Sequence, residues 1–482
     1  MLTNHNLNNV DLKDIKALIT EYYQQGKHHQ IIALVKLVLN AKNFTGEKLF
    51  FYHHASIAAF YCNEPQLGRE CNDVLLFCND NNLRKTAITN GRFYATQLNS
   101  CEQIQVPFNP PALIEPKSQY LDQNYRCMNP AIVNMSNINQ NIDSCNDKIC
   151  MNPAIVNMSN INQNTDSSVK TADNFCYWYV QRTSNFDQVK GSSYTCMESD
   201  NLVKTRNYLV KLDDKFNIIQ QWEIIDTITT IHRPCHVTGI EDIRLYAVAK
   251  ENGEHDLYIS GTTFYNHDYG APKISWGKLK QPDESHDIVE LEYFNPILNP
   301  NPKNTEKNWS FAHYKDDEFI VMYKLNPLQV YKFKSDDPDN SWEEVFRQSN
   351  KVYGEYMRGS AGPIRYNNGW LAIGHEVIYD TDNNGNITGR TYLHRFIWYN
   401  DLVNCKPGDV KISHAFYFSD DFSNFNIEFC LGMTKHHHDD SILLGVGIND
   451  RKAKLFRVKY EIIDQMLHDF NNVDLDVCDD EW

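Results

Sequence analysis

Two adjacent carboxylates and an arginine lie within the stretch GIEDIRL, as Glu241, Asp242 and Arg244. We expect this triplet to lie between two strands, at about 231–237 and 257–265. The three groups together can hold a sugar hydroxyl, a proton and an anion, because arginine favours ionised carboxylates and binds phosphate through its planar fork. The same triplet also suits a turn with a surface ion pair, which is a common feature of proteins. Motifs elsewhere in the chain are needed to distinguish a substrate site from a surface ion pair.

Two more conspicuous motifs favour turns over metal sites. Residues 380–387, DTDNNGNI, match the first eight positions of a calcium-binding loop, but the twelfth position is Thr391 where a bidentate glutamate is required. We expect a hairpin tip there. The run HHHDD at 436–440 falls between two expected strands, where consecutive side chains point to opposite faces. We expect an exposed turn, and no metal or other cofactor in this protein.

Composition narrows the class of protein. The chain has 482 residues, of which 41% are hydrophobic and 12% aromatic, which is enough to build packed cores in more than one domain. Its 62 acidic and 46 basic residues leave a formal charge of −16, which opposes binding to nucleic acid. There is no apolar run of membrane-spanning length and no signal-peptide pattern at the start, so we expect a cytoplasmic protein without a membrane span. The 13 scattered cysteines are expected to be reduced and mostly buried.

The first part of the chain, 1–106, is predicted to be a small all-α domain. Apolar residues recur at helical spacing from about residue 9 to residue 98, with Gly26 at the turn between the first two helices. Two helix pairs of similar sequence resemble a short tetratricopeptide-like repeat. Such helices either offer a docking surface to a protein partner or only cover the neighbouring domain.

A linker with an internal duplication is predicted at 107–170. The sequence CMNPAIVNMSNINQN at 127–141 recurs unchanged at 150–164, a period of 23 residues. Only one copy can occupy a given strand position, so we expect the other to form an Asn-rich loop.

Residues 171–470 read as many short strands separated by turns, and the tail 471–482 is acidic. Strands are clearest at 175–181, 207–211, 219–225, 257–263, 318–325, 330–333, 369–377, 390–398, 415–418, 427–433, 442–448 and 454–460. A helix is expected at 462–470. About 300 residues of this pattern favours a β-propeller over a single sandwich. The predicted fold class is therefore mainly β, with a propeller that follows a small helical-repeat domain.

Five local signatures occur in order through this region. They are RTSNF…KTRNYLVKLD (182–213), GIEDIRLY (239–246), EKNWSFA (306–312), YMRGSAGPI…GWLAIGHEV (356–377) and GVGINDRKA (445–453). Together with NPAIV, they resemble the five-bladed propellers of glycoside hydrolase family 130, the mannoside phosphorylases, and the β-mannosyltransferases of similar fold. The resemblance covers roughly residues 152–460. The Asn-rich, duplicated and helix-prefixed organisation resembles the glycosylation genes of large DNA viruses, which would place the protein in the host cytoplasm.

The resemblance implies a role for particular residues. The family's Glu-Asp-Pro-Arg motif reads Glu-Asp-Ile-Arg here, so the general acid is implied at Asp242, with Ile243 in place of the proline that would stiffen the turn. Substrate binding is implied for Glu241, Arg244 and Asp450. Phosphate binding is implied for Lys307, Arg358 and His375, beside Arg244. Each also has a plainer interpretation, such as a strand-linking ion pair, a solvated turn or a core histidine.

The chemistry leaves several reactions open. Phosphorolysis needs one acid and a set of cations that position phosphate, and a sugar-nucleotide transferase needs a similar grip on diphosphate. Hydrolysis with inversion needs a second carboxylate as base, for which Glu241, Glu355 and Glu376 are candidates. The sequence therefore predicts inverting glycosyl transfer to or from phosphate or a nucleotide sugar, with mannose or a related hexose. The alternative is a non-catalytic glycan-binding or scaffolding propeller whose helices recruit a partner.

Overall fold

The structure is a computed structural model. It describes residues 12–39, 48–76, 78, 80–98, 101–104, 106, 126–134, 175–188, 194–196, 202–228, 237–250, 255–264, 272–298, 300, 307–325, 328–347, 357–382, 384–385, 387–403, 410–419, 427–450 and 452–469.

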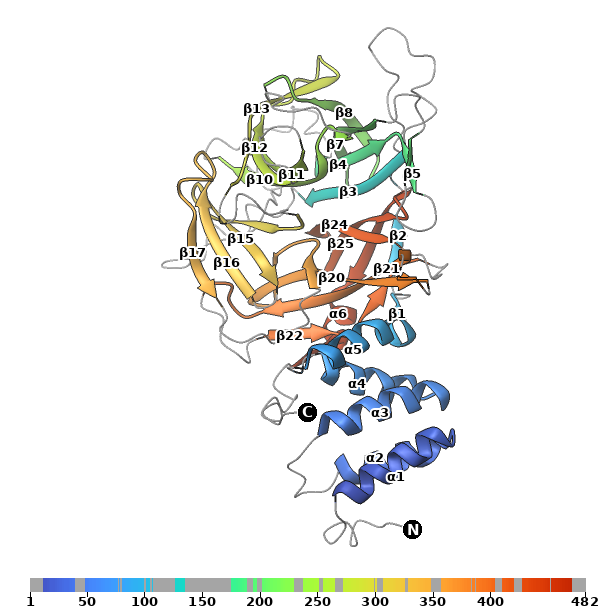
Figure 1. Ribbon diagram of the computed structural model, residues 1–482. Coiled ribbons are helices and arrows are strands. Elements are labelled where there is room, and N and C mark those ends of the chain that lie inside the picture. Colours follow the sequence, from blue (N-terminus) through green and yellow to red (C-terminus); the bar gives the residue numbers. More distant parts are fainter. Residues whose placement is uncertain are drawn as a thin grey trace.

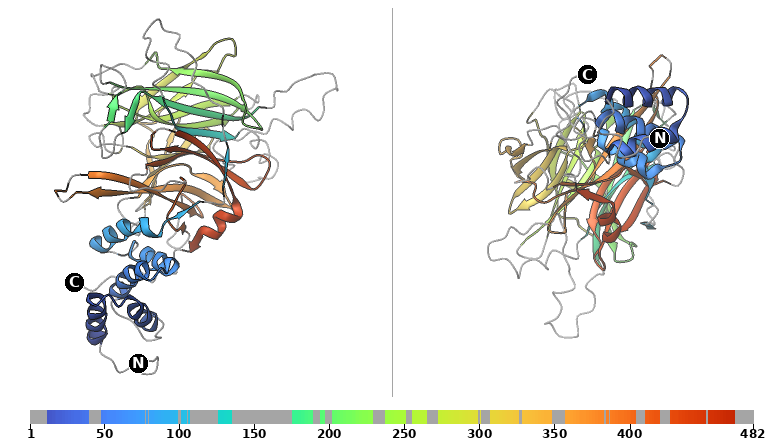
Figure 2. Two further views of the ribbon diagram at one scale, coloured as in Figure 1. Left: turned by 90° about the vertical axis from the view of Figure 1, so that its right-hand side faces the viewer. Right: turned by 90° about the horizontal axis from the view of Figure 1, so that it is seen from below.

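Five helices follow one another in the N-terminal part, and each packs against the next (Figures 1 and 2). They are α1 (Leu12–Gln24), α2 (His28–Leu39), α3 (Lys48–Tyr61), α4 (Pro65–Leu76) and α5 (Asn81–Tyr94). Local signals set their ends. Gly26 has a φ of 66° in the turn after α1, and the Asp80 carboxylate accepts hydrogen bonds from two backbone N–H groups at the start of α5. Helices occur where the apolar spacing predicted them, whereas the tetratricopeptide-like repeat stays a prediction.

The rest of the described chain is mainly β. The largest sheet has nine strands, in the order β10-β11-β12-β13-β8-β7-β4-β3 with β9 beside β7. Its members are β3 (Arg126–Asn134), β4 (Phe175–Ser184), β7 (Val203–Asp213), β8 (Ile218–Ile225), β9 (Val237–Thr238), β10 (Glu241–Ala249), β11 (His255–Thr263), β12 (Lys273–Leu279) and β13 (Ile288–Pro296). Neighbours are antiparallel, apart from the parallel pairs β13–β8 and β7–β9.

Four further sheets complete the β part. An eight-stranded sheet contains β1 (Thr96–Gln97), β18 (Met357–Gly359), β19 (Ile364–Tyr366), β20 (Gly369–Thr381), β21 (Ile387–Tyr399), β22 (Val410–Ser413), β23 (Phe416–Tyr417) and β27 (Leu467–Asp469). One four-stranded sheet contains β14 (Ser310–Lys315), β15 (Glu318–Leu325), β16 (Leu328–Lys334) and β17 (Glu343–Arg347). The other contains β2 (Cys101–Ile104), β24 (Glu428–Lys435), β25 (Ser441–Ile448) and β26 (Lys452–Lys459), and is followed by the helix α6 (Tyr460–Met466). A small hairpin pairs β5 (Phe186–Gln188) with β6 (Tyr194–Cys196).

The chain just after the helices joins the last strands of the sequence. Residues 96–104, inside the range predicted as helical, instead form β1, which runs parallel to β23, and β2, which is antiparallel to β26. A two-residue and a four-residue strand carry little helical periodicity, and their hydrogen-bonding partners are more than 300 residues away in sequence. This pairing attaches the helices to the C-terminal end of the β part.

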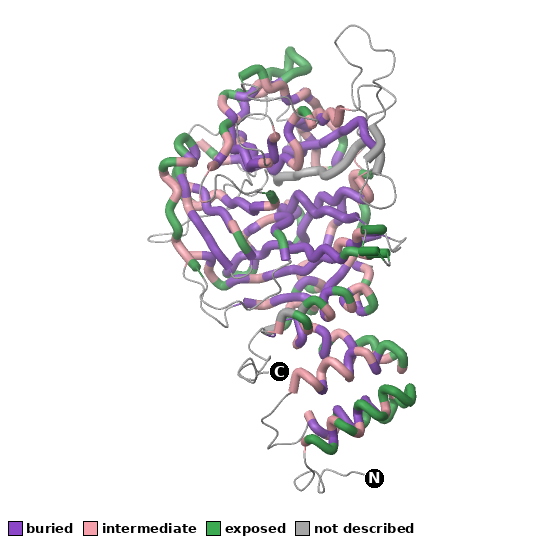
Figure 3. The backbone as a smooth tube through the Cα atoms, in the orientation of Figure 1, coloured by how far each residue is buried: buried purple, intermediate pink, exposed green. Residues whose placement is uncertain are grey.

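The strands form the buried interior, and exposed residues gather on the helices and the connecting segments (Figure 3). One apolar cluster joins both parts, because Leu75 of α4 and Ile88 of α5 pack with Leu393 and Ile397 of β21. None of the helices in the described part of the chain has the length and apolar composition that crossing a bilayer requires.

The first copy of the duplication and the calcium-like stretch both lie in strands or hairpins of the β part. The first copy of the duplication supplies most of β3, where Cys127 pairs with Thr183 of β4, and the second copy lies outside the described residues. The calcium-like stretch is the tip of the β20–β21 hairpin, where Asp380 pairs with Arg92 of α5. Its acidic side chains are therefore on a hairpin, as the flanking strand patterns predicted.

Candidate active site

Arg182 of β4 is the centre of the candidate site. Its side chain is 5% exposed, and its Nη1 donates to Asp242 Oδ1 at 2.6 Å. Its Nη2 lies 3.4 Å from both Glu241 Oε1 and Thr205 Oγ1. Burial alone lowers the pKa of Arg182, but the charges of Asp242, Glu241 and Asp450 raise it overall. One guanidinium therefore lies among three carboxyl groups from two segments, the start of β10 and the turn after β25.

An irregular start to β10 presents Glu241 and Asp242 to Arg182. Gly239 has a φ of 84°, and a Cβ at this position would lie 2.1 Å from the Thr205 carbonyl oxygen. The register against β11 shifts between Glu241 and Arg244, and Asp242 has a φ of 54°. A bulge of this kind redirects side chains without ending the strand. The triplet thus begins a strand instead of lying in a turn between two strands.

Ile243 stands where the related motif has proline, and it is 1% exposed in the apolar core. The bulge, the Arg182 hydrogen bond and this buried anchor together set the direction of Asp242. These contacts supply locally what a proline would otherwise contribute through its restricted backbone.

Asp450 is the third carboxyl group of the site. It follows β25, and both Asn449 and Asp450 have positive φ values, 51° and 48°. Burial raises the pKa of Asp450 to about 6, helped by the negative charges of Asp242 and Glu241 and opposed by two arginines, Arg182 and Arg390. The site therefore holds a carboxyl group that gains or loses its proton near neutral pH.

Two further cations, Lys307 and Arg390, lie beside these acids, and a third, Arg358, lies next to His375. Lys307 is 38% exposed, lies 3.5 Å from Glu241 Oε2, and is 5.0 Å from the centroid of the Phe264 ring. Arg390 of β21 is close enough to lower the pKa of Asp450, and its buried Nε has no hydrogen-bond partner within the described residues. Arg358 of β18 is exposed, and the described part of the chain contains no carboxylate within ion-pair distance of it. Positive charge is thus available on the solvent side of the carboxyl groups.

Arg244 and His375 lie deeper, and both contact Ser360. The Arg244 guanidinium donates to the Ser360 carbonyl at 3.1 and 3.2 Å, and the Ser360 hydroxyl is 2.8 Å from His375 Nδ1. Burial, His394, Arg358 and Arg244 lower the pKa of His375 well below its usual value. His375 also stacks on Tyr392, with ring centroids 5.2 Å apart. A neutral histidine in this position can orient a neighbour but adds no positive charge for phosphate.

The candidate bases for hydrolysis have different surroundings. Glu241 lies in the site, whereas Glu376 is 2% exposed and its Oε1 accepts from Arg395 Nε at 2.6 Å. Arg395 also reaches Asp73 of α4, so Glu376 serves the contact between helices and sheet. Glu355 lies outside the described residues.

The structure therefore brings Glu241, Asp242, Asp450 and Lys307 together around Arg182, and places Arg244 and His375 behind them at Ser360. Sequence reasoning did not select Arg182 or Arg390 as site residues. Arg182 is the first residue of the first signature, which is the signal that could have identified it. Arg390 belongs to no signature, and its proximity to Asp450 arises from the packing of β21 near the end of β25, two strands of different sheets.

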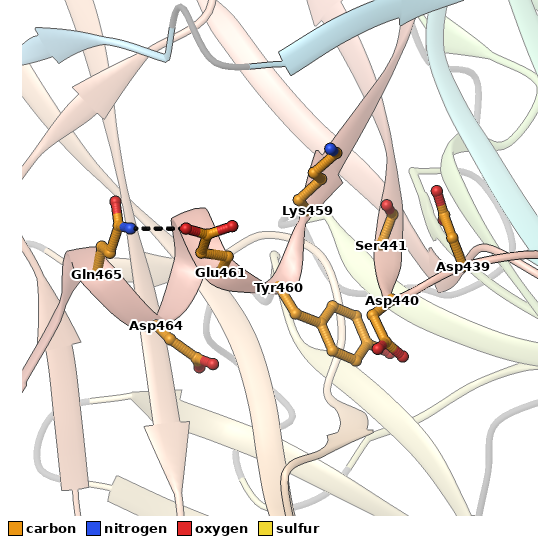
Figure 4. Close-up of a pocket in the computed structure, with 8 residues that line it drawn as sticks. All are labelled: Asp439, Asp440, Ser441, Lys459, Tyr460, Glu461, Asp464 and Gln465. Carbon is orange, nitrogen blue, oxygen red and sulfur yellow. Dashed lines mark hydrogen bonds between the residues drawn. The ribbon is translucent and has the colours of Figure 1, made fainter.

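A hollow of about 720 Å³ lies elsewhere, around the start of α6, lined by Asp439, Asp440, Ser441, Lys459, Tyr460, Glu461, Asp464 and Gln465 (Figure 4). Ser441 begins β25 and Asp450 follows its far end, so about 26 Å of strand separates the hollow from the Arg182 site. Its carboxylates are partly engaged, since Asp464 accepts from the Tyr366 hydroxyl at 2.7 Å. A mainly acidic lining does not suit a phosphate.

No protein-family model and no curated protein matches the chain. Solved structures show remote likeness. A β-1,2-mannobiose phosphorylase from Listeria innocua is 11% identical, with 60% of this chain and 88% of that chain covered and a TM-score of 0.35. MPT-1, a GDP-Man-dependent mannosyltransferase from Leishmania mexicana, is 13% identical, with 70% and 86% covered and a TM-score of 0.39. A levansucrase from B. megaterium is 8% identical, with 74% and 92% covered and a TM-score of 0.33. Likenesses at this level do not define a shared fold.

Proposed function

We propose that this protein is a carbohydrate-active enzyme that carries out inverting glycosyl transfer to or from phosphate or a nucleotide diphosphate. The observation that carries the proposal is the arrangement around Arg182, where carboxyl groups in contrasting environments lie beside accessible cations. The five sequence signatures contribute to this site, through Arg182, Asp242, Lys307, Arg358 and Asp450. A hexose such as mannose is the sugar that the family resemblance favours.

A five-bladed propeller is the architecture we propose for the β part. Five successive sets of strands along the chain fit five blades: β3-β4-β7-β8, β10 to β13, β14 to β17, β18 to β23, and β24 to β26. The parallel β13–β8 pair joins the first two sets into the nine-stranded sheet. Strand β2, from the start of the chain, completes the last set. An early strand added to the final set would close a ring of blades, as propellers require. The carboxyl groups of the site then come from different sets.

The two aspartates are proposed to divide the chemistry. Asp242 shares a charge-assisted hydrogen bond with Arg182, which favours the ionised carboxylate. Asp450, with a pKa of about 6, is the better proton donor near neutral pH. The family resemblance assigns the general acid to Asp242, whereas these contacts favour Asp450 as the proton donor. In this scheme Asp242 and Glu241 bind sugar hydroxyls.

The cations are proposed to bind the phosphate or diphosphate. Lys307, Arg358 and Arg390 border the acids, and phosphate already carries the negative charge of a nucleophile. Such a nucleophile needs positioning more than deprotonation, so a set of cations beside one acid is sufficient. Hydrolysis would also need a base with room for water, and we propose Glu241, which lies 3.4 Å from Arg182 Nη2, as the candidate for that role.

A second candidate is a glycan-binding scaffold, favoured by exposed aromatic side chains on the helices. Tyr23, Phe60, Tyr61 and Phe93 are between 41% and 62% exposed, which suits contact with another protein. The involvement of Arg244 and His375 with Ser360 also reduces the number of cations available to phosphate.

Release of phosphate or nucleotide from a panel of sugar-1-phosphates and sugar nucleotides, with and without sugar acceptors, tests the proposal. We expect turnover in the wild type and losses of about 10²–10⁴-fold in Asp242→Asn and Asp450→Asn, the usual contribution of positioned acid–base groups. Asp256→Asn is the matched control, because Asp256 pairs with Lys250 at 2.8 Å away from the site. Equal background release in all four proteins, with sugar binding retained, would support the scaffold instead.

A further inference from the structure

Two connecting segments far apart in sequence meet beside β4. The first joins β7 to β8 and carries Asp214, and the second joins β24 to β25 and carries the histidines 436–438. One ligand atom from each of Asp214, His437 and His438 lies within 4.8 Å of the others. His438 Nε2 lies 3.8 Å from Asp214 Oδ2, and the ring centroids of His437 and His438 are 3.4 Å apart.

The histidine-containing turn between β24 and β25 is less exposed than the sequence predicted. His436 is 6% exposed, His437 is partly buried, and the exposed residues begin at His438. Strand alternation does not apply, because β24 ends at Lys435 and β25 begins at Ser441. Consecutive histidines can therefore point to the same side, which the sequence pattern argued against.

Buried neighbours orient the two ligand-bearing segments. The Tyr177 hydroxyl contacts His437 Nδ1, and Tyr177 is fully buried and stacks on Phe216 with centroids 5.1 Å apart. Metal-binding histidines commonly use one ring nitrogen for the ion and the other for an orienting hydrogen bond. The Tyr177 contact at Nδ1 therefore assigns the ligand role to His437 Nε2.

We propose that Asp214, His437 and His438 form a binding site for a divalent transition-metal ion of the zinc type. Two imidazoles and one carboxylate suit such an ion better than Mg²⁺ or Ca²⁺, which prefer oxygen ligands. Bonds of about 2.0–2.1 Å to zinc place tetrahedral ligand atoms about 3.4 Å apart, so small side-chain rotations would close the site. Water supplies the fourth ligand on the exposed side of His438.

The ion would link strands from the beginning and the end of the β part. Tyr177, Val210, Leu443 and Leu455 already form one buried cluster across this boundary. An ion held by the β7–β8 and β24–β25 segments would fasten the same boundary from the outside. The Arg182 site lies toward the opposite end of β25, so this role is independent of the proposed glycosyl transfer.

Cobalt binding to the full chain, purified without a histidine tag and stripped of metal, tests the site. We expect one Co²⁺ per chain with a tetrahedral visible absorption band that Zn²⁺ displaces. His438→Gln changes an exposed residue and should lower the affinity by more than about 100-fold, because loss of an orienting partner alone costs about 10–100-fold. Tyr177→Phe should produce a loss in that smaller range.

His286→Gln is the matched control, since His286 forms an exposed pair with Asp283 at 3.0 Å and should leave cobalt binding unchanged. Zn²⁺ should also raise the melting temperature of the wild type but not of His438→Gln, because an ion that binds the folded state stabilises it. Absence of saturable Co²⁺ binding by the wild type, or equal binding by wild type and His438→Gln, would overturn the proposal.

Discussion

Arg182 and Arg395 are both buried arginines that bind two carboxylates, yet their surroundings give them different uses. Arg395 is 1% exposed and joins Glu376 of β20 at 2.6 Å to Asp73 of α4 at 3.0 Å. Its Nη1 also donates to the Ser413 carbonyl at 3.0 Å. Glu376 raises the pKa of Arg395 and so does Asp73, and together they outweigh the lowering by burial. Helix and sheet enclose this cluster, so its charge serves the attachment of α4.

Around Arg182 the carboxylates stay closer to solvent. Asp242 is 20% exposed and Glu241 is 15% exposed, whereas Arg395 binds one carboxylate that is 2% exposed, Glu376, and one that is 18% exposed, Asp73. A third carboxyl group, Asp450, lies beside Asp242 and Glu241, and its pKa is raised by burial and by their negative charges, against the opposing charges of Arg182 and Arg390. A buried arginine that binds two carboxylates is therefore not by itself evidence of a substrate-binding site. The Arg182 cluster differs because both of its paired carboxylates reach solvent and because a third carboxyl group, Asp450, lies beside them.

The largest effect is expected for Arg395→Met. Removing the guanidinium leaves Glu376 buried without its partner, and breaking a buried pair in this way costs about 3–5 kcal/mol of the free energy of unfolding. Denaturant unfolding measures the loss. Lys36→Met is the control, because Lys36 is 52% exposed in its pair with Glu64 and should change stability little. A similarly small loss for both variants would show that the Arg395 network does not anchor α4.

Arg182→Met should destabilise the protein less, by about 1–3 kcal/mol, because Asp242 and Glu241 can still be hydrated when their partner is lost. Turnover of any sugar donor should nevertheless fall more than in Arg395→Met, measured on the folded fraction of each variant. The comparison between the two arginines would fail if Arg182→Met were the less stable protein and retained full turnover.

The pH dependence of the stability of Asp450→Asn tests whether the pKa of Asp450 is raised in the folded protein. The folded-state pKa of about 6 lies above the ordinary 3.8, so the folded state binds this proton more tightly than the unfolded state. The contribution of this protonation to the free energy of unfolding is fully present below about pH 4. It is lost as the pH rises through about 6. We expect unfolding measured from pH 4 to 7 to show a smaller decline in Asp450→Asn than in the wild type. Parallel curves would mean that Asp450 has an ordinary pKa.

Lys307→Met should have the smallest effect on stability, below about 1 kcal/mol, because its contact with Glu241 is partly exposed. If Lys307 binds phosphate, the variant should raise KM for the phosphate-bearing donor or acceptor more than it lowers kcat. Steady-state kinetics at several phosphate concentrations measure both. An unchanged KM would remove Lys307 from the phosphate-binding set.

Much of the local structure could be predicted. Short apolar runs bounded by turn residues identified strands such as β15 and β25, and Gly26 correctly marked the turn between the first two helices. The start of β10 was harder to predict, because Gly239 packs closely on the Thr205 backbone just before a bulge between Glu241 and Arg244. The Arg182 contact with Asp242 joins residues 60 positions apart, and Arg395 and Asp73 are 322 apart. Such contacts leave no periodic signal in the sequence.

By itself, the sequence determined the types of element, the acidic character of the chain and the acid–acid–arginine triplet, because these depend on residue type and spacing along the chain. Tertiary structure alone decided which charges meet and how much water reaches them. Burial makes His375 neutral and raises the pKa of Asp450, while Glu376 is left only 2% exposed and Asp242 20% exposed. These outcomes depend on desolvation and on charges from distant segments, which arise only when the strands and helices are packed together.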